Sequence, residues 1–174
     1  METKIRCDWV GEDSLMIAYH DKEWGVPLHE DAKLFELLIL EGAQAGLSWA
    51  TVLKKRENYR KAFDLFDVKK IAEYDSKKID LLIADSGIIR NKLKIAAAIQ
   101  NAKAFQAAQK EFGSFDKYIW QFTDGKIGKN AEVMSKDLLR RGFKFVGPTI
   151  CYAFMQAVGM VNDHQIKCFR YDEV

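Results

Sequence analysis

Apolar residues recur at helical spacing along most of this chain, and no run of residues alternates between apolar and polar as a half-buried strand does. The segments with the helical pattern are 31–46, 48–63, 68–75, 76–85, 90–112, 114–122 and 135–142, followed by one that begins at Pro148. A period of 3.6 residues buries one face of a helix, whereas a strand needs a period of two. The pattern therefore predicts a compact all-α fold.

The ends of these segments carry residue types that start and stop helices. Ser48, Ser76 and Ser114 have hydroxyl groups that accept a hydrogen bond from a free amide of a first helical turn. Gly113 follows the longest segment, in the position where a left-handed glycine commonly ends a helix. Pro148 suits a first helical position, because no amide hydrogen is needed there. We expect helices to begin and end at these residues.

Size and composition limit the class of protein. With 174 residues, of which 48% are hydrophobic, the chain can bury its own core, and we expect one domain over residues 1–174. No apolar run approaches the roughly 20 residues that span a bilayer, and the first residues lack an apolar signal core. The three cysteines fit a reducing compartment. We therefore expect a cytoplasmic protein with no membrane partner.

Two further features leave the function open. The net charge of +2 neither requires nor excludes a nucleic-acid partner, because phosphate is contacted by a local basic face. The polar stretch 123–130, TDGKIGKN, shows no helical pattern and is expected to be a flexible loop. Function must therefore be sought in particular side chains.

The stretch NDHQIKC places His164 and Cys168 four residues apart, so on a helix both would share one face and reach one ion. Cys7 and His20 can supply two more ligands from the N-terminal segment. Four protein ligands fill the tetrahedron of zinc and leave no position for water, so such an ion would be structural. It would join the first and last segments. Alternatively, Cys7 is an inert thiol and His20 a surface side chain, and the spacing alone does not decide.

Residues 138–164 form a helix, a glycine-containing connector and a second helix, LLRRGFKFVGPTICYAFMQAVGMVNDH. This arrangement resembles the helix-hairpin-helix of DNA repair glycosylases, in which amides of the connector point at a DNA phosphate. Gly142, Lys144 and Gly147 would place amide and ammonium groups at the DNA backbone. An ordinary pair of helices joined by a short turn is the alternative.

The hairpin departs from that superfamily at two positions. Bifunctional members carry a lysine nucleophile two residues after the last hairpin glycine, where this chain has Thr149. Most members carry a catalytic aspartate after the second helix, where this chain has Asn162, although Asp163 is adjacent. Lyase chemistry is therefore not expected, and the usual water-activating carboxylate is not evident.

Longer blocks show a closer resemblance. YHDKEWGVP, LEGAQAGLSWATVLKKRENYRKAF, SGIIRNKLKI and RRGFKFVGPTICYAFMQAVGMVNDH follow in order and cover most of the chain. They are similar to the type I DNA-3-methyladenine glycosylases of bacteria. The resemblance implies a helix-hairpin-helix glycosylase fold and one structural zinc ion. Its ligands would be a Cys–His pair near the start and a His-x3-Cys pair near the end, here Cys7, His20, His164 and Cys168.

The same resemblance implies a function. The expected activity is that of a monofunctional, monomeric DNA glycosylase that flips 3-methyladenine out of alkylated double-stranded DNA and hydrolyses its N-glycosidic bond, which starts base excision repair. An adenine methylated at N3 is cationic while it is attached to the sugar, so electron-rich rings suit it. The candidate rings are Trp9, Tyr19, Trp24 and Trp49. The alternative for each is packing in the core.

Glu41 is the candidate catalytic and base-recognising acid. It follows an apolar helix, where an unpaired carboxylate is costly to bury, and it could instead face water at the helix end. The resemblance implies that it lines the base pocket and accepts hydrogen bonds from the adenine edge, while a role in activating water stays open. Gly46 and Leu47 lie at the following turn, where an exposed leucine could fill the gap left by a flipped base, although Leu47 could equally belong to the core.

Two other functions compete with this one. A zinc-stapled module without catalysis would bind DNA and release no base. A zinc hydrolase would need an open metal position, which four protein ligands do not leave.

Overall fold

The computed structural model describes residues 4–123 and 129–174, and every regular element in these residues is a helix. This confirms the predicted all-α fold. The α-helices are α1 (Ser14–Lys22), α2 (Asp31–Gln44), α3 (Trp49–Ala62), α4 (Val68–Ala72), α5 (Ser76–Ala84), α6 (Lys92–Phe112), α7 (Phe115–Ile119), α8 (Lys129–Arg140) and α9 (Pro148–Ala157). Short 3₁₀ turns are η1 (Asp8–Val10), η2 (Asp64–Phe66) and η3 (Trp120–Phe122).

Most of the predicted helix ends are confirmed. The Ser48 and Ser114 side chains accept from the amides of Thr51 and Lys117. Gly113 ends α6 with φ 88°, and Pro148 begins α9. The prediction for Ser76 is wrong: Asp75, one residue earlier, caps α5 by accepting from the amide of Lys78. Both residue types cap helices, and the carboxylate takes the position.

Other boundaries differ from the expectation. Helix α8 begins at Lys129, six residues before the predicted segment, because Ala131, Met134 and Leu138 already form a buried stripe. Of the predicted loop 123–130, residues 124–128 lie outside the described residues, and the last two residues belong to α8. The segment 114–122 is not one α-helix, because the short helix α7 is followed directly by the 3₁₀ turn η3. Helix α1, for which no range was predicted, is capped by Asp13.

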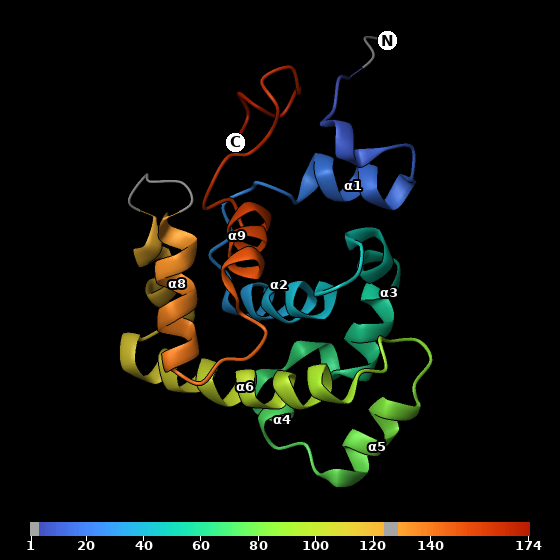
Figure 1. Cartoon of the computed structure of the whole chain (residues 1–174), viewed down its shortest axis with the longest axis vertical. Helices are drawn as coiled ribbons and strands as arrows, with labels where there is room; N and C mark the ends of the chain where they lie inside the picture. Colours follow the sequence, from blue (N-terminus) through green and yellow to red (C-terminus); the bar gives the residue numbers. More distant parts are fainter. Residues whose placement is uncertain (1–3, 124–128) are drawn as a thin grey trace.

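Helix α2 lies at the centre of the fold. Every residue from Leu34 to Ala43 is buried, including Glu36 and Glu41. A helix that is covered all round needs neighbours on several sides, and Figure 1 shows α6 crossing below α2, with α9 on the opposite side and α3 at one end. Helices α4 and α5 lie beyond α6. No helix in residues 4–123 and 129–174 is both long and apolar enough to cross a membrane.

The two ends of the described chain lie side by side (Figure 1). The Phe169 amide donates to the carbonyl of Ile5 over 2.9 Å. The backbone amide of Asp8 donates a hydrogen bond to the side-chain oxygen of Gln165, and the Asp8 carboxylate forms an ion pair with Lys167. The segment after α9 is therefore held against the segment before α1, as the predicted ligand set requires.

Candidate active site and cysteine–histidine cluster

A pocket of about 200 Å³ opens between α1, α2, α3 and α9. Its lining residues are Trp9, Tyr19, Trp24, Glu41, Gln44, Trp49, Ala153 and Gln156. All five side chains predicted for base recognition are among them, although they come from four separate parts of the chain. The volume and the aromatic walls suit one flat ring with a few polar groups.

Glu41 is the acid of this pocket. It is 3% exposed, and its Oε2 atom has no hydrogen-bond partner in the described part of the chain. Burial raises the pKa of Glu41 to about 8, because the ionised form loses water and gains no cation. A buried, unpartnered carboxyl group that faces a cavity is costly to keep, so it marks a place where a polar ligand would supply the missing partner.

Aromatic rings form the walls around Glu41. Tyr19 and Trp49 lie with ring centroids 5.1 Å apart, and Trp9 and Trp24 with centroids 5.0 Å apart at 70°. The buried Trp49 Nε1 atom also has no partner among the described residues. Burial, followed by the nearby charge of Glu41, raises the pKa of Tyr19 well above its usual value, so this hydroxyl stays neutral. The pocket thus combines ring faces with unpartnered polar atoms.

Sequence reasoning missed three residues of the lining. Gln44 is three positions after Glu41 on α2, and Gln156 is three positions after Ala153 on α9. The helical spacing from Glu41 could have indicated Gln44. Nothing in the sequence distinguishes Ala153 and Gln156 from other residues of α9, because their place in the pocket depends on how α9 packs against α2.

The four predicted ligands come together where the segment after α9 packs against the N-terminal residues. One ligand atom each from Cys7, His20, His164 and Cys168 lies within 4.8 Å of every other, and all four residues are buried. The Cys168 Sγ atom is 3.4 Å from His20 Nε2 and 3.6 Å from His164 Nδ1. Tetrahedral bonds to one zinc ion would place a sulfur and a nitrogen about 3.5 Å apart. The four residues could therefore hold a metal ion.

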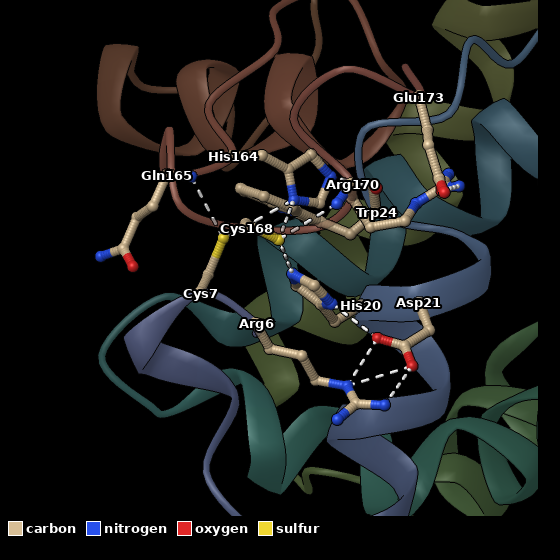
Figure 2. A network of polar contacts seen from close by, with 10 residues as sticks. All are labelled: Arg6, Cys7, His20, Asp21, Trp24, His164, Gln165, Cys168, Arg170 and Glu173. Carbon is tan, nitrogen blue, oxygen red and sulfur yellow. Dashed lines mark hydrogen bonds and ion pairs between the residues drawn. The ribbon is translucent and has the colours of Figure 1, made fainter. Parts of the chain in front are cut away.

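In each histidine, the ring nitrogen that does not face the cluster has a hydrogen-bond partner of its own, which orients the imidazole (Figure 2). His20 Nδ1 lies 2.8 Å from Asp21, whose pKa is lowered first by the guanidinium of Arg6. The ionised Asp21 accepts the Nδ1 hydrogen, which leaves His20 Nε2 free for an ion. His164 Nε2 donates to the carbonyl of Trp24 over 3.2 Å, which leaves its Nδ1 free. Such partners are characteristic of histidines that bind metals.

Backbone amides stabilise the sulfur atoms. The amides of Gln165 and Arg170 donate to Cys7 Sγ and Cys168 Sγ over 3.3 and 3.4 Å (Figure 2). Burial raises the pKa of Cys7 to about 11, so an ion would have to displace the thiol proton. A donor set of two cysteine sulfurs and two imidazole nitrogens matches the preference of zinc.

His164 and Cys168 share no helix, so the helical spacing considered for them does not explain how they meet. Both residues lie in the irregular segment that follows the end of α9. They meet because this segment folds back against the N-terminal residues. Gly25, with φ 81°, allows the approach: a Cβ atom there would lie 2.9 Å from His164 Nε2.

The residues predicted to contact DNA lie in two turns. Gly46 has φ 77°, and Leu47 is 43% exposed in the turn between α2 and α3. Lys144 is exposed and Gly147 precedes α9, both in the connector that follows α8. The two turns share one neighbour, α6, whose side chains bond to the backbone near each.

Neither residue considered for the superfamily aspartate lines the pocket. The Asn162 side chain donates to the carbonyls of Tyr171 and Val174 and so holds the C-terminal segment. Asp163 accepts from Tyr152 and from Gln156, over 2.7 and 2.6 Å. Because Gln156 lines the pocket, Asp163 is one hydrogen bond away from it.

Comparisons with known proteins agree on the family. The family model for methyladenine glycosylase matches residues 9–171. DNA-3-methyladenine glycosylase 1 of Escherichia coli is 47% identical over 95% of this chain and 96% of its own length. A crystal structure of 3-methyladenine DNA glycosylase I superposes with a TM-score of 0.90 at 50% identity, covering 95% of this chain and 98% of the other.

A more distant solved structure shows the same fold. It concerns 3-methyladenine recognition by 3-methyladenine DNA glycosylase I of Staphylococcus aureus, with a TM-score of 0.89 and 35% identity over 94% of this chain and 95% of the other. The matched residues 9–171 include the pocket and three of the four residues of the cluster. On this evidence the chain belongs to the methyladenine glycosylase family.

Proposed function

We propose that this protein is a monofunctional DNA glycosylase that removes 3-methyladenine from alkylated double-stranded DNA. The observation that carries the proposal is the unpartnered carboxyl group of Glu41 inside an aromatic pocket. The names of the relatives support the choice of substrate. A damaged base in a duplex is out of reach of such a pocket, so the nucleotide must turn out of the helix first.

The reaction needs little help with the leaving group. In 3-methyladenine the ring is cationic while it is bound to the sugar. When the bond between C1′ and N9 breaks, both electrons go to the base, which leaves neutral. Water adds to C1′ and loses a proton, so the products are free 3-methyladenine and an abasic site. The protein's main tasks are to hold the extruded cation and to exclude ordinary adenine.

Glu41 performs the polar part of this recognition. Its free oxygen accepts a hydrogen bond from the edge of the base, and the positive ring favours the ionised carboxylate. The faces of Tyr19 and Trp49 contribute stacking, which is worth about 1–3 kcal/mol per base. Trp9 and Trp24 close the other wall. Ordinary adenine is neutral and gains less from the carboxylate and from the ring faces.

The cysteine–histidine cluster holds one structural zinc ion in this proposal. With Cys7, His20, His164 and Cys168 as ligands, no coordination position is left for water or substrate. The ion joins the first and last segments of the chain and takes no part in bond cleavage. A cobalt-substituted protein should give the absorption spectrum of a tetrahedral site with two sulfurs and two nitrogens, whereas a water-bound spectrum would contradict a closed site.

DNA is held by a helix-hairpin-helix made of α8, the connector and α9. Lys144 and Gly147 contact the phosphate backbone, because an ammonium group and exposed amides suit an anion. Gly46 lets the turn after α2 approach the duplex, and Leu47 fills the space that the extruded base leaves. The protein acts as a monomer.

The test is incubation with methylated duplex DNA followed by chromatography of the released bases. Wild-type protein should release 3-methyladenine and leave the DNA backbone intact until alkali is added. Glu41→Gln should slow release by at least about tenfold, since one hydrogen bond to a charged group contributes about 1.5–3 kcal/mol. Glu30→Gln, an exposed change at the start of the same helix, is the control. No released purine from the wild type would refute the proposal.

A further inference from the structure

Two polar side chains of α6 are bonded to backbone that belongs to other parts of the fold. Lys94 Nζ donates to the carbonyls of Ala43 and Ala45 over 2.8 and 2.7 Å. Asn101 Nδ2 donates to the carbonyl of Lys144 over 3.0 Å, and its Oδ1 accepts from the amide of Lys144 over 2.7 Å. Neither side chain lines the pocket around Glu41.

Lys94 holds the end of α2. The last carbonyls of a helix have no partner within it and carry partial negative charge, so an ammonium group there satisfies and stabilises them. The carbonyls of Ala43 and Ala45 lie just before Gly46 and Leu47, the turn proposed to enter the duplex. Burial lowers the pKa of Lys94, as expected for a cation partly removed from water.

Asn101 holds the hairpin connector. It is 3% exposed, and it bonds the amide and the carbonyl of the same residue, Lys144, so both peptide groups around that residue are fixed. The next residue, Phe145, has φ 55°, a conformation that only surrounding structure keeps populated in a bulky residue. Lys144 and Gly147, the proposed phosphate contacts, lie on either side of Phe145.

The two bonded segments also touch each other. A Cβ atom added to Gly42 would lie 3.3 Å from Phe145 Cβ, so α2 and the connector approach closely at this glycine. Lys94, Asn101, Gly42 and Phe145 all line one small cavity of about 20 Å³. Lys94 and Asn101 are seven residues apart, close to two helical turns, so α6 separates their attachment points by about 10 Å along its axis.

From this geometry we infer that Lys94 and Asn101 are positioning residues for DNA. Through them α6 sets the distance and orientation between the Gly46–Leu47 turn and the hairpin connector, so that one duplex can engage both. The inference rests on the proposed function, because it takes both turns as DNA contacts. Neither residue touches the base, so each acts on the affinity for duplex and on the extrusion of the base from it.

The chain contains a matched control on another helix. Lys55 Nζ donates to the carbonyls of Ser86 and Gly87, and Asn58 Nδ2 donates to the carbonyl of Gly87. These are the same kinds of bond, from α3 to a loop that the proposal does not assign to DNA. Lys55→Met and Asn58→Leu therefore remove donor bonds of the same kind without changing either DNA turn. Asn58 only donates a bond to this loop, whereas Asn101 also accepts one.

The experiment compares two affinities in the same variants. Lys94→Met and Asn101→Leu remove the bonding groups and keep side chains of similar size. Fluorescence anisotropy measures binding to a duplex with a stable abasic analogue, and quenching of tryptophan emission measures binding of free 3-methyladenine. We expect each variant to bind the duplex at least tenfold more weakly and to bind the free base within twofold of wild type. The control variants should keep both affinities within twofold.

Several outcomes would overturn the inference. Unchanged duplex affinity in both variants would do so, as would an equal loss of duplex and free-base binding, which indicates general damage. An equal loss in the control variants would also count against it. If Asn101→Leu does not fold, Asn101→Asp tests the same bond, since it keeps the acceptor and loses the donor. Failure of the wild type to release 3-methyladenine is measured first and refutes the proposed function separately.

Discussion

The imidazole of His164 lies edge-on against the indole of Trp24, with ring centroids 4.6 Å apart and an interplanar angle of 80°. The same indole lines the pocket that contains Glu41. One residue of the cysteine–histidine cluster therefore touches a wall of the candidate active site, and its Nε2 atom also bonds to the Trp24 backbone. The arrangement of the cysteine–histidine cluster and the shape of the pocket are therefore coupled through the contact between His164 and Trp24.

Loss of the proposed zinc ion should therefore affect stability and the pocket together. Cys168→Ser should lose the bound metal and lower the Tm by about 10 °C, because a structural ion contributes several kcal/mol and each kcal/mol shifts a domain of this size by about 2–4 °C. Binding of free 3-methyladenine should weaken as Trp24 loses its support. Metal analysis and thermal unfolding measure these effects. Cys151→Ala, outside the cluster, should keep one ion per chain.

A methyl group at Gly25 should displace His164. Gly25→Ala adds a Cβ atom 2.9 Å from His164 Nε2 and requires a residue with φ 81°. Gly11→Ala is the control, since Gly11 has φ 62° and no atom of the described residues lies within 4 Å of the added Cβ. Both changes strain the backbone, by about 1–3 kcal/mol, but only the first should lower metal affinity in a competition with a chelator. Equal metal affinities would contradict the assigned packing.

The raised pKa of Glu41 predicts a stability that depends on pH. The unfolded chain ionises near pH 4.5, whereas the folded chain keeps this proton until about pH 8. Between these values the folded state is destabilised as pH rises, by at most about 1.4 kcal/mol per unit. Glu41→Gln removes the effect, so its Tm relative to wild type should rise by several degrees from pH 5 to pH 8. A pH-independent difference would show that Glu41 is not held protonated.

Removing the side chain of Leu47 should affect duplex substrates most. If Leu47 fills the gap left by the base, Leu47→Ala should slow release of 3-methyladenine from duplex by about tenfold, in line with the few kcal/mol that unstacking costs. Single-stranded DNA has no duplex stack with a gap for Leu47 to fill, so release from it should change less. Leu65→Ala, at a 77% exposed leucine of η2, is the control. Equal effects on both substrates would leave Leu47 without this role.

Much of the site could be predicted because its residues belong to unusual types. Glu41 is a carboxylate within an apolar helix, and the chain contains only three cysteines and three histidines. Each of these residues is therefore a candidate for a functional role. The resemblance to a family then joined residues that spacing alone could not connect. In the structure all four predicted ligands meet, as do the predicted acid and rings.

What could not be predicted depends on packing between distant segments. A spacing of four fits an irregular segment as well as a helix, so the sequence does not show how His164 and Cys168 come together. Gln156 resembles any polar residue of a surface helix until α9 is placed against α2. Lys94 and Asn101 likewise belong to an ordinary amphipathic pattern, and their partners lie about 50 and 43 residues away.

The pairing of the two ends of the chain has a consequence for biosynthesis. Cys7 and His20 are translated well before His164 and Cys168. A nascent chain thus holds only half of the cysteine–histidine cluster until Cys168 has left the exit tunnel. Capture of the proposed ion must therefore follow the synthesis of both halves.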